Sequence, residues 1–260
     1  MADVASGSRE RTLANTLTSP RVLELVALAV LAVAYNVIRA QAGNDVAAAF
    51  QNAADIIRIE GPIFDKIEIP LNQAMATMPL IAVPACYFYA VLHYLVTPTI
   101  LFISWKRGGI AYRRGYWTLI LASAIGLAIY ATYPLAPPRL MTGMGTIDVM
   151  REFSHYGWWG GAASAPTAIG DATNQFAAMP SLHCGWAIWC GIQMWGFGGR
   201  IWKTLAIAYP ALQVYVVIAT ANHYLLDVMG GAAVVLVGLV IVLSWERWLA
   251  PAKEKSRTPA

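Results

Sequence analysis

Charged residues are scarce in this sequence. Asp, Glu, Lys and Arg make up only 12% of the 260 residues, whereas 58% are hydrophobic and the mean hydropathy is positive. Soluble domains carry about a quarter charged residues, so the scarcity excludes an ordinary soluble domain and indicates a membrane protein. In such a protein a formal net charge of +4 reflects uneven charge between the loops, and we expect no binding to nucleic acid.

Cysteine is also rare. Cys86, Cys184 and Cys190 lie inside apolar runs, at spacings that fit neither a zinc site nor a disulfide framework. We therefore expect all three to be small core residues. The sequence also lacks a cluster of carboxylates that would bind a metal ion, and we predict that the protein uses no metal and no other cofactor.

The first twenty residues lack the short apolar core and the small-residue cleavage site of a signal peptide. We therefore expect the first apolar segment to remain in the protein as a membrane anchor. A convincing internal repeat is also missing, which argues against a transporter built from two inverted halves.

Long apolar runs are what the sequence does contain. Six of them are long enough to cross about 30 Å of hydrocarbon at ~1.5 Å per residue of helix. They lie near residues 22–39, 79–104, 116–133, 180–197, 202–220 and 223–245. The sequence therefore predicts an all-α polytopic integral membrane protein with a bundle of six transmembrane helices.

Two long connectors interrupt these runs. Residues 40–78 alternate apolar and charged positions at helical spacing and are broken at Gly61-Pro62, which predicts short amphipathic, interfacial helices in the first outer loop. In the second long connector, residues 134–179, we expect Trp158 and Trp159 to be interfacial anchors.

Basic residues are concentrated in the other connectors and the two tails, which hold 13 of the 18 lysines and arginines. These residues are Arg9, Arg11, Arg21, Lys106, Arg107, Arg113, Arg114, Arg200, Lys203, Arg247, Lys253, Lys255 and Arg257. The positive-inside rule then places both termini in the cytoplasm and the connectors 40–78 and 134–179 on the outer side.

The stretch AAMPSLHCGWA, residues 177–187, places His183 three residues after Pro180 at the start of an apolar run. Proline suits the first turn of a helix, so we predict that the fourth span begins at Pro180 and that the amides of residues 181–183 point outward. A helix N-terminus of this kind is suited to bind an anion.

A second stretch, ANHYLLDVMGG, places Asp227 four residues after His223. This spacing predicts that both side chains lie on one helical face within hydrogen-bond reach. A carboxylate that accepts a hydrogen bond from one ring nitrogen orients the imidazole and leaves the other nitrogen as a directed nucleophile or base. The alternative is a purely structural hydrogen bond, but charged groups in a membrane are costly and usually functional.

A third stretch, YPLAPPRL, places Arg139 just after the third span. Counting spans puts Arg139, His183 and His223 at the outward ends of their helices, so the three pieces share one face of the membrane.

The remaining histidines have simpler interpretations. We expect His93, within the second span, to be a packing or hydrogen-bonding residue, and His155 to be a loop residue.

The motifs PSLH at 180–183 and HYLLD at 223–227 resemble the second and third signature motifs of the type-2 phosphatidate phosphatase superfamily. Residues 52–60, NAADIIRIE, resemble a stretch found in bacterial members of its inositol phosphorylceramide synthase branch. The phosphatases usually carry a lysine upstream of the first-motif arginine and Ser-Arg before the third motif, where this chain has Val216 and Val217. In these features the chain is more similar to the phosphotransferase branch.

The resemblance implies a reaction mechanism. His223, oriented by Asp227, would attack phosphorus and form a phosphohistidine, while His183 would protonate the departing oxygen and later deprotonate the acceptor. The candidates for binding the substrate phosphate are Arg139 and the residues that carry the amides at the start of the fourth span, Ser181 and Leu182. Histidines in the first turn of their helices would hold phosphorus at the level of lipid head groups.

The leading hypothesis is a lipid phosphotransferase that moves a phosphorylated head group, such as phosphoinositol, onto a lipid alcohol. The alternatives are a lipid-phosphate phosphatase with water as acceptor and a transporter or structural membrane protein. The expected partners are a phospholipid or lipid-phosphate substrate, a lipid alcohol or water, and the bilayer; the oligomeric state stays open. The expected location is the plasma membrane, with the active site on the extracytoplasmic face.

These expectations divide the chain into four parts. They are a cytoplasmic N-terminal tail at 1–21, the first span with the outer amphipathic segment at 22–78, a catalytic transmembrane core at 79–248, and a basic cytoplasmic tail at 249–260.

Overall fold

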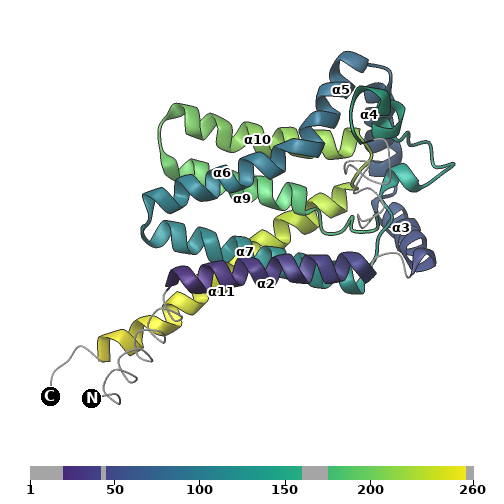
Figure 1. Cartoon of the computed structure of the whole chain (residues 1–260). Helices are drawn as coiled ribbons and strands as arrows, with labels where there is room; N and C mark the ends of the chain where they lie inside the picture. The colour runs from purple at the N-terminus through teal and green to yellow at the C-terminus, as the bar shows by residue number, and fades with distance from the viewer. Residues whose placement is uncertain (1–19, 42–44, 160–174, 256–260) are drawn as a thin grey trace, which may run out of the picture.

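The computed structural model describes residues 20–41, 45–159 and 175–255. The expected N-terminal tail therefore lies almost entirely outside the described residues, as do residues 256–260 of the C-terminal tail. Within the described ranges, helices are the only extended regular structure, and one isolated bridge joins Leu135 to Ala177. The long helices run along a common direction, and α3 (Val46–Glu60) and α4 (Ile69–Ala76) gather at one end (Figure 1).

Five described helical stretches are long and apolar enough to cross a membrane, which confirms the prediction of an all-α polytopic membrane protein. They are α2 (Pro20–Gln41), the stretch from α5 (Pro79–Tyr87) through η2 (Phe88–Leu92) to α6 (His93–Arg107), α7 (Gly109–Thr132), α10 (Arg200–Ala219) and α11 (Leu225–Lys255). Helix α7 begins at Gly109 rather than near residue 116, so it includes residues that we expected in a connector.

The fourth predicted span, 180–197, forms a shorter helix. Helix α9 (Leu182–Phe197) has 16 residues, fewer than the roughly 20 that a full crossing needs. It begins where the Ser181 hydroxyl accepts a hydrogen bond from the Cys184 amide, and it ends at Gly198, whose φ of 78° leaves the helical region. Helix α9 nevertheless lies inside the bundle, in contact with α6, α7, α10 and α11.

Helices α9 and α11 approach each other closely at their N-terminal ends. A Cβ atom added to Gly231 of α11 would lie 2.2 Å from the Ser181 carbonyl oxygen, so only glycine allows this approach. The Ser181 amide also donates a hydrogen bond to the Asp227 carbonyl at 2.8 Å. The close approach therefore brings the PSLH stretch against the HYLLD stretch.

The outer segment is helical, as predicted, and it breaks at Gly61, which has a φ of 48°. It consists of α3, the π-helical turn η1 (Phe64–Glu68) and α4. The segment packs into the protein, because Phe64 is fully buried and packs with the buried Leu135 and Tyr224. It therefore covers the end of the bundle at which α10 stops and α11 begins (Figure 1).

Some smaller predictions can now be compared with the structure. All three cysteines are free and buried, which confirms that they are core residues. Trp158 is 39% exposed, but the prediction of an interfacial anchor is wrong for Trp159, which is 1% exposed. The Trp159 ring packs edge-on against Tyr87, with ring centroids 4.6 Å apart, because the second connector folds back onto α5.

The basic connectors meet at the end of the bundle opposite the outer segment. The Arg107 guanidinium, at the end of α6, donates a hydrogen bond to the Phe197 carbonyl at the end of α9, at 3.0 Å. Its Cζ atom also lies 4.3 Å from the centre of the Phe197 ring. The turns that follow α6 and α9, both of which carry basic residues, therefore lie side by side.

Candidate active site

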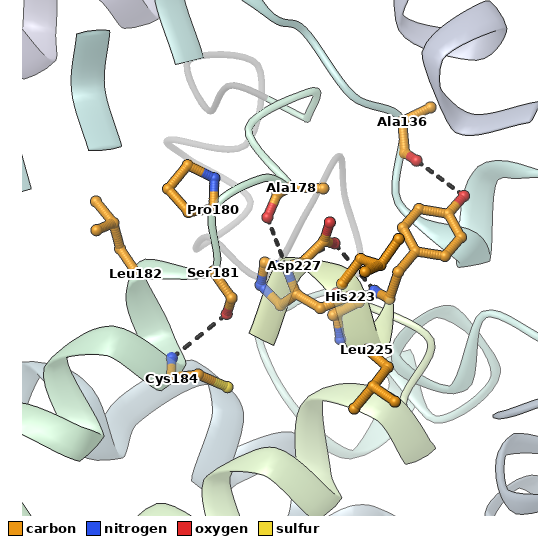
Figure 2. A network of polar contacts seen from close by, with 12 residues as sticks. Ala136, Ala178, Pro180, Ser181, Leu182, Cys184, His223, Leu225 and Asp227 are labelled. Carbon is orange, nitrogen blue, oxygen red and sulfur yellow. Dashed lines mark hydrogen bonds and ion pairs between the residues drawn. The ribbon is translucent and has the colours of Figure 1, made fainter. Parts of the chain in front are cut away.

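The two histidines singled out in the sequence lie next to each other in the structure. His183 is in the first turn of α9, His223 lies two residues before the start of α11, and their ring centroids are 5.7 Å apart. Figure 2 shows His223 and Asp227 beside the segment from Ala178 to Ser181 that leads into α9. The predicted grouping of these residues is therefore present at one end of the bundle.

His223 lies in the turn before α11, not within the helix as we predicted, because α11 begins at Leu225. The His223 Nδ1 atom lies 2.9 Å from the Ala178 carbonyl oxygen and 3.4 Å from Asp227 Oδ2. A carbonyl oxygen can only accept, so this contact places the proton on Nδ1 and the lone pair on Nε2.

The Nε2 atom of His223 is buried and has no hydrogen-bond partner among the described residues. Leaving a buried polar atom unpaired costs about 1–3 kcal/mol, and such atoms in a folded protein call for a functional explanation. With Nδ1 held by Ala178 and Asp227, an unpaired Nε2 is what a nucleophile or base requires.

Asp227 is fully buried and has two roles in this arrangement. Its Oδ2 atom accepts a hydrogen bond from the Tyr224 amide at 2.9 Å, and this contact caps the start of α11. The same oxygen faces the His223 ring at 3.4 Å. The cap fixes the carboxylate, so the carboxylate can in turn fix the histidine.

His183 is enclosed by two residues that we did not predict as part of the site. Its ring stacks on Tyr89, with centroids 4.5 Å apart and planes 18° from parallel, and meets His93 edge-on at 4.2 Å. Tyr89 lies in the π-helical turn η2 and His93 directly follows that turn. Turns of this type are frequent at functional sites, but a π-helical turn has no clear signal in one sequence.

His93 does hydrogen-bond, as predicted, because its Nδ1 atom lies 3.2 Å from the Tyr89 carbonyl oxygen. Its position against His183 was not predicted. His155 lies on the surface in the short helix η4 (Ser154–Tyr156), away from this group.

Arg139, in the short helix η3 (Pro138–Leu140), reaches the turn that carries His223. Its Nε atom donates to the Asn222 side chain at 3.1 Å, and its Nη1 atom lies 3.3 Å from Asp148 Oδ2. Its backbone amide donates to the carbonyl of Ala221 at 2.8 Å. The arginine side chain is 7% exposed, so a fixed positive charge stands beside the histidine turn.

The turn between α10 and α11 is strained and tightly held. Ala221 has a φ of 55°, which is unfavourable for a residue with a side chain. The amides of Asn222 and His223 both donate to the Val217 carbonyl, at 3.0 and 3.2 Å. Val217 is fully buried in the apolar core, so the position where the phosphatases usually carry arginine supplies no positive charge here.

The amides at the helix starts are largely engaged within the protein. The Ser181 amide donates to Asp227, and the Leu182 amide lies 3.4 Å from the Tyr130 hydroxyl. At the start of α11, the amides of Leu225 and Leu226 donate to glutamate side chains from the outer segment. The positive charge that the described residues bring to the histidine turn is that of Arg139, whose guanidinium bonds to Asn222 and Asp148.

Among the described residues, no group of three or more His, Cys, Asp or Glu side chains is arranged to hold a metal ion. Two surface hollows lie along α9 and α10 around Trp195 and Ile207, near the other end of α9, and none of the predicted site residues lines them.

Comparison with known families gives a match over most of the chain. The family model described as the PAP2 superfamily matches residues 54–241. Comparison with curated proteins and with solved structures gives no match. The matched range begins inside α3 and ends inside α11, so it contains His183, His223 and Asp227 together with Arg139. The chain therefore belongs to the PAP2 superfamily, whose membrane-embedded members catalyse phosphatase or phosphotransferase reactions on lipid phosphates.

Proposed function

We propose that this protein is a lipid phosphotransferase that moves a phosphorylated head group, such as phosphoinositol, from a phospholipid onto a lipid alcohol. The observation that carries the proposal is the buried, unpaired Nε2 atom of His223, whose ring is oriented from the Nδ1 side. This is the arrangement expected of a nucleophile that forms a covalent intermediate.

The first half of the reaction forms a phosphohistidine. Nε2 of His223 attacks the phosphorus of the donor lipid, the bond from phosphorus to the diacylglycerol oxygen breaks, and His183 gives a proton to that oxygen. The ring centroids of the two histidines are 5.7 Å apart, so one phosphoryl group between them would be within reach of both. Arg139 would stabilise the negative charge on the phosphoryl oxygens.

The second half returns the enzyme to its starting state. His183, now neutral, takes the proton from the hydroxyl of the acceptor lipid, whose oxygen attacks phosphorus while the bond to Nε2 of His223 breaks. The buried surroundings of the site favour a lipid alcohol over water, because Asp227 and Ser181 are fully buried and His223 is 4% exposed. Water as acceptor would make the same site a phosphatase.

The experiment that tests the proposal compares products. Purified protein is incubated with phosphatidylinositol labelled in the head group and with a lipid alcohol such as ceramide, and in parallel with labelled phosphatidate. We expect the label to move to a new phospholipid. Release of inorganic phosphate from phosphatidate, with no new phospholipid, would instead identify a phosphatase.

His183→Ala should affect substrates according to their leaving groups. Without the acid, we expect turnover of the natural lipid to fall at least about 100-fold. An analogue with p-nitrophenol as leaving group needs little protonation, so its initial burst of p-nitrophenol should survive. Single-turnover measurements on both substrates check this, and an equal loss on the two substrates would contradict an acid role for His183.

The orientation in the membrane can be tested with introduced cysteines. The native cysteines are buried, so background labelling should be low. Met144 and Ile110 are exposed, at 40% and 50%. Ile110 is the second residue of α7, whereas Met144 lies in the connector beyond the other end of α7, next to Gly145, which contacts Gln73 of α4. With a membrane-impermeant maleimide on intact cells, we expect labelling of Met144→Cys and protection of Ile110→Cys until the membrane is opened. The reverse pattern would put the site in the cytoplasm.

A further inference from the structure

Two glutamates of the outer segment are buried against the helix that follows His223. Glu60, the last residue of α3, is 5% exposed, and Glu68, in η1, is 4% exposed. Glu60 Oε1 accepts a hydrogen bond from the Leu226 amide at 2.7 Å, and Glu68 Oε1 accepts one from the Leu225 amide at 2.9 Å. The mechanism given above uses neither residue.

These two contacts complete the cap of α11. The first amides of a helix have no partner within the helix, and here three consecutive ones are satisfied by carboxylates. Asp227 takes the amide of Tyr224, Glu68 takes that of Leu225 and Glu60 takes that of Leu226. His223 is the residue directly before this cap, so the position of its ring depends on where α11 begins.

The charge at this site is unbalanced if every acid is ionised. Within the described part of the chain, neither glutamate forms an ion pair, and Arg139 is paired with Asp148. The second oxygen of each glutamate, Oε2, is buried without a donor. Two buried carboxylates beside Asp227 would repel one another and would also repel an anionic substrate.

A proton held between the glutamates removes this conflict. Glu60 and Glu68 accept from the amides of two adjacent residues, Leu226 and Leu225, so their carboxyl groups are neighbours. Burial together with the neighbouring Glu60 charge raises the pKa of Glu68 from 4.5 to about 8. The other acidic groups that face the pair are Asp227 and the Tyr224 phenol of α11. Each of these neighbours favours the protonated pair, because another negative charge there would be unfavourable.

We infer that Glu60 and Glu68 are positioning residues that share one proton and hold the start of α11, and with it His223, in the reactive position. The inference rests on the proposed role of His223 for its effect on catalysis, but the shared proton and the cap can be tested without any activity. It also gives the outer segment a role, since α3 and η1 supply the two carboxyls.

Substitutions at Glu68 separate the cap from the charge. Glu68→Gln resembles the protonated side chain, because its oxygen can still accept from the Leu225 amide and its nitrogen can donate to Glu60. Glu68→Ala removes the cap. Asp65→Asn is the matched control, because Asp65 is exposed on the same turn, η1. Each purified protein is measured for Tm, kcat and KM between about pH 5 and pH 9.

The expected pH dependence follows from the raised pKa of Glu68, which is about 8 when folded against a usual value of 4.5. Between these values the folded protein holds a proton that the unfolded chain releases, so stability falls as pH rises and levels off above about 8. We expect this fall in the Tm of the unsubstituted protein and of Asp65→Asn. In Glu68→Gln the fall should be much smaller.

We expect kcat to depend on whether the cap of α11 is kept. Glu68→Gln should keep kcat within a few-fold of the unsubstituted protein near pH 7, whereas Glu68→Ala should lower kcat about 10- to 100-fold with little change in KM. An equal pH dependence of Tm in Glu68→Gln and Asp65→Asn would overturn the shared proton. A kcat for Glu68→Ala equal to that of Asp65→Asn would overturn the positioning role.

The outcome also distinguishes this inference from the proposed function. If His223→Ala keeps full activity while the Tm of Glu68→Gln loses its pH dependence, the nucleophile is misassigned and the shared proton stands. If His223→Ala is inactive while both Glu68 variants behave as the control does, the proposed function stands and the inference is wrong.

Discussion

His223→Ala is expected to abolish turnover and to leave no phosphoenzyme. The Nε2 atom of His223 is buried without a hydrogen-bond partner among the described residues, the His183 ring lies 5.7 Å away between centroids, and the proposed covalent intermediate forms on this nitrogen. We expect a loss of at least about 10⁴-fold in kcat, down to the background of the assay. The measurement is rapid quenching with labelled donor lipid, followed by detection of acid-labile label on the protein.

The substitution should leave the fold intact, because the alanine keeps the backbone bonds of the turn and removes only the ring. His155→Ala is the matched control, since His155 is an exposed histidine outside the site. It should show normal turnover and normal phosphoenzyme. Label trapped on the His223→Ala protein would contradict the assignment of the nucleophile.

Asp227→Asn is expected to lower kcat by about 10³-fold while KM changes only a few-fold. The asparagine has the same shape, and its oxygen can still accept from the Tyr224 amide, so the cap of α11 should survive. The Ala178 carbonyl can still hold Nδ1 of His223. The loss therefore measures the negative charge of Asp227, which stabilises positive charge on the ring as His223 bonds to phosphorus.

Single-turnover rates and substrate binding must be measured separately for this variant. A large increase in KM with an unchanged kcat would assign Asp227 to substrate binding and not to the activation of His223. A normal kcat would mean that the Ala178 carbonyl alone orients the ring. The surface variant Asp65→Asn again serves as the control for loss of one carboxylate.

The proposed reaction also explains where the site lies. His183 and His223 are at the ends of apolar helices, at the end of the bundle covered by α3, η1 and α4. A donor and an acceptor that both have a polar head and apolar chains can bring their reacting oxygens to this level while the chains stay in the bilayer. A soluble phosphate ester would gain nothing from such a position.

The sequence by itself determined the features that depend on neighbours within about four residues or on composition. Low charge and long apolar runs gave the all-α membrane fold. Pro180 predicted the start of α9 to within two residues of Leu182, and the spacing of His223 and Asp227 predicted their contact. Local geometry fixes such contacts in almost any fold, so they can be predicted without knowing the tertiary structure.

Local spacing was less reliable for exact helix boundaries. His223 was expected inside the last helix but precedes it, because Asp227, Glu60 and Glu68 cap the amides of residues 224–226. Helix α9 begins at Leu182, two residues after the predicted start at Pro180, because the Ser181 hydroxyl caps the helix there by accepting from the Cys184 amide. In both cases a cap set the start of the helix, and hydropathy alone does not reveal it.

Only the tertiary structure decided which distant residues complete the site. Glu60 lies 166 residues before its partner Leu226, and no sequence spacing predicts that contact. Likewise, Tyr89 and His93 reach His183 only because the π-helical turn of the second span packs against α9. The physical reason is that periodicity shows which face of a helix is apolar, whereas the choice of neighbour depends on how all the helices pack together.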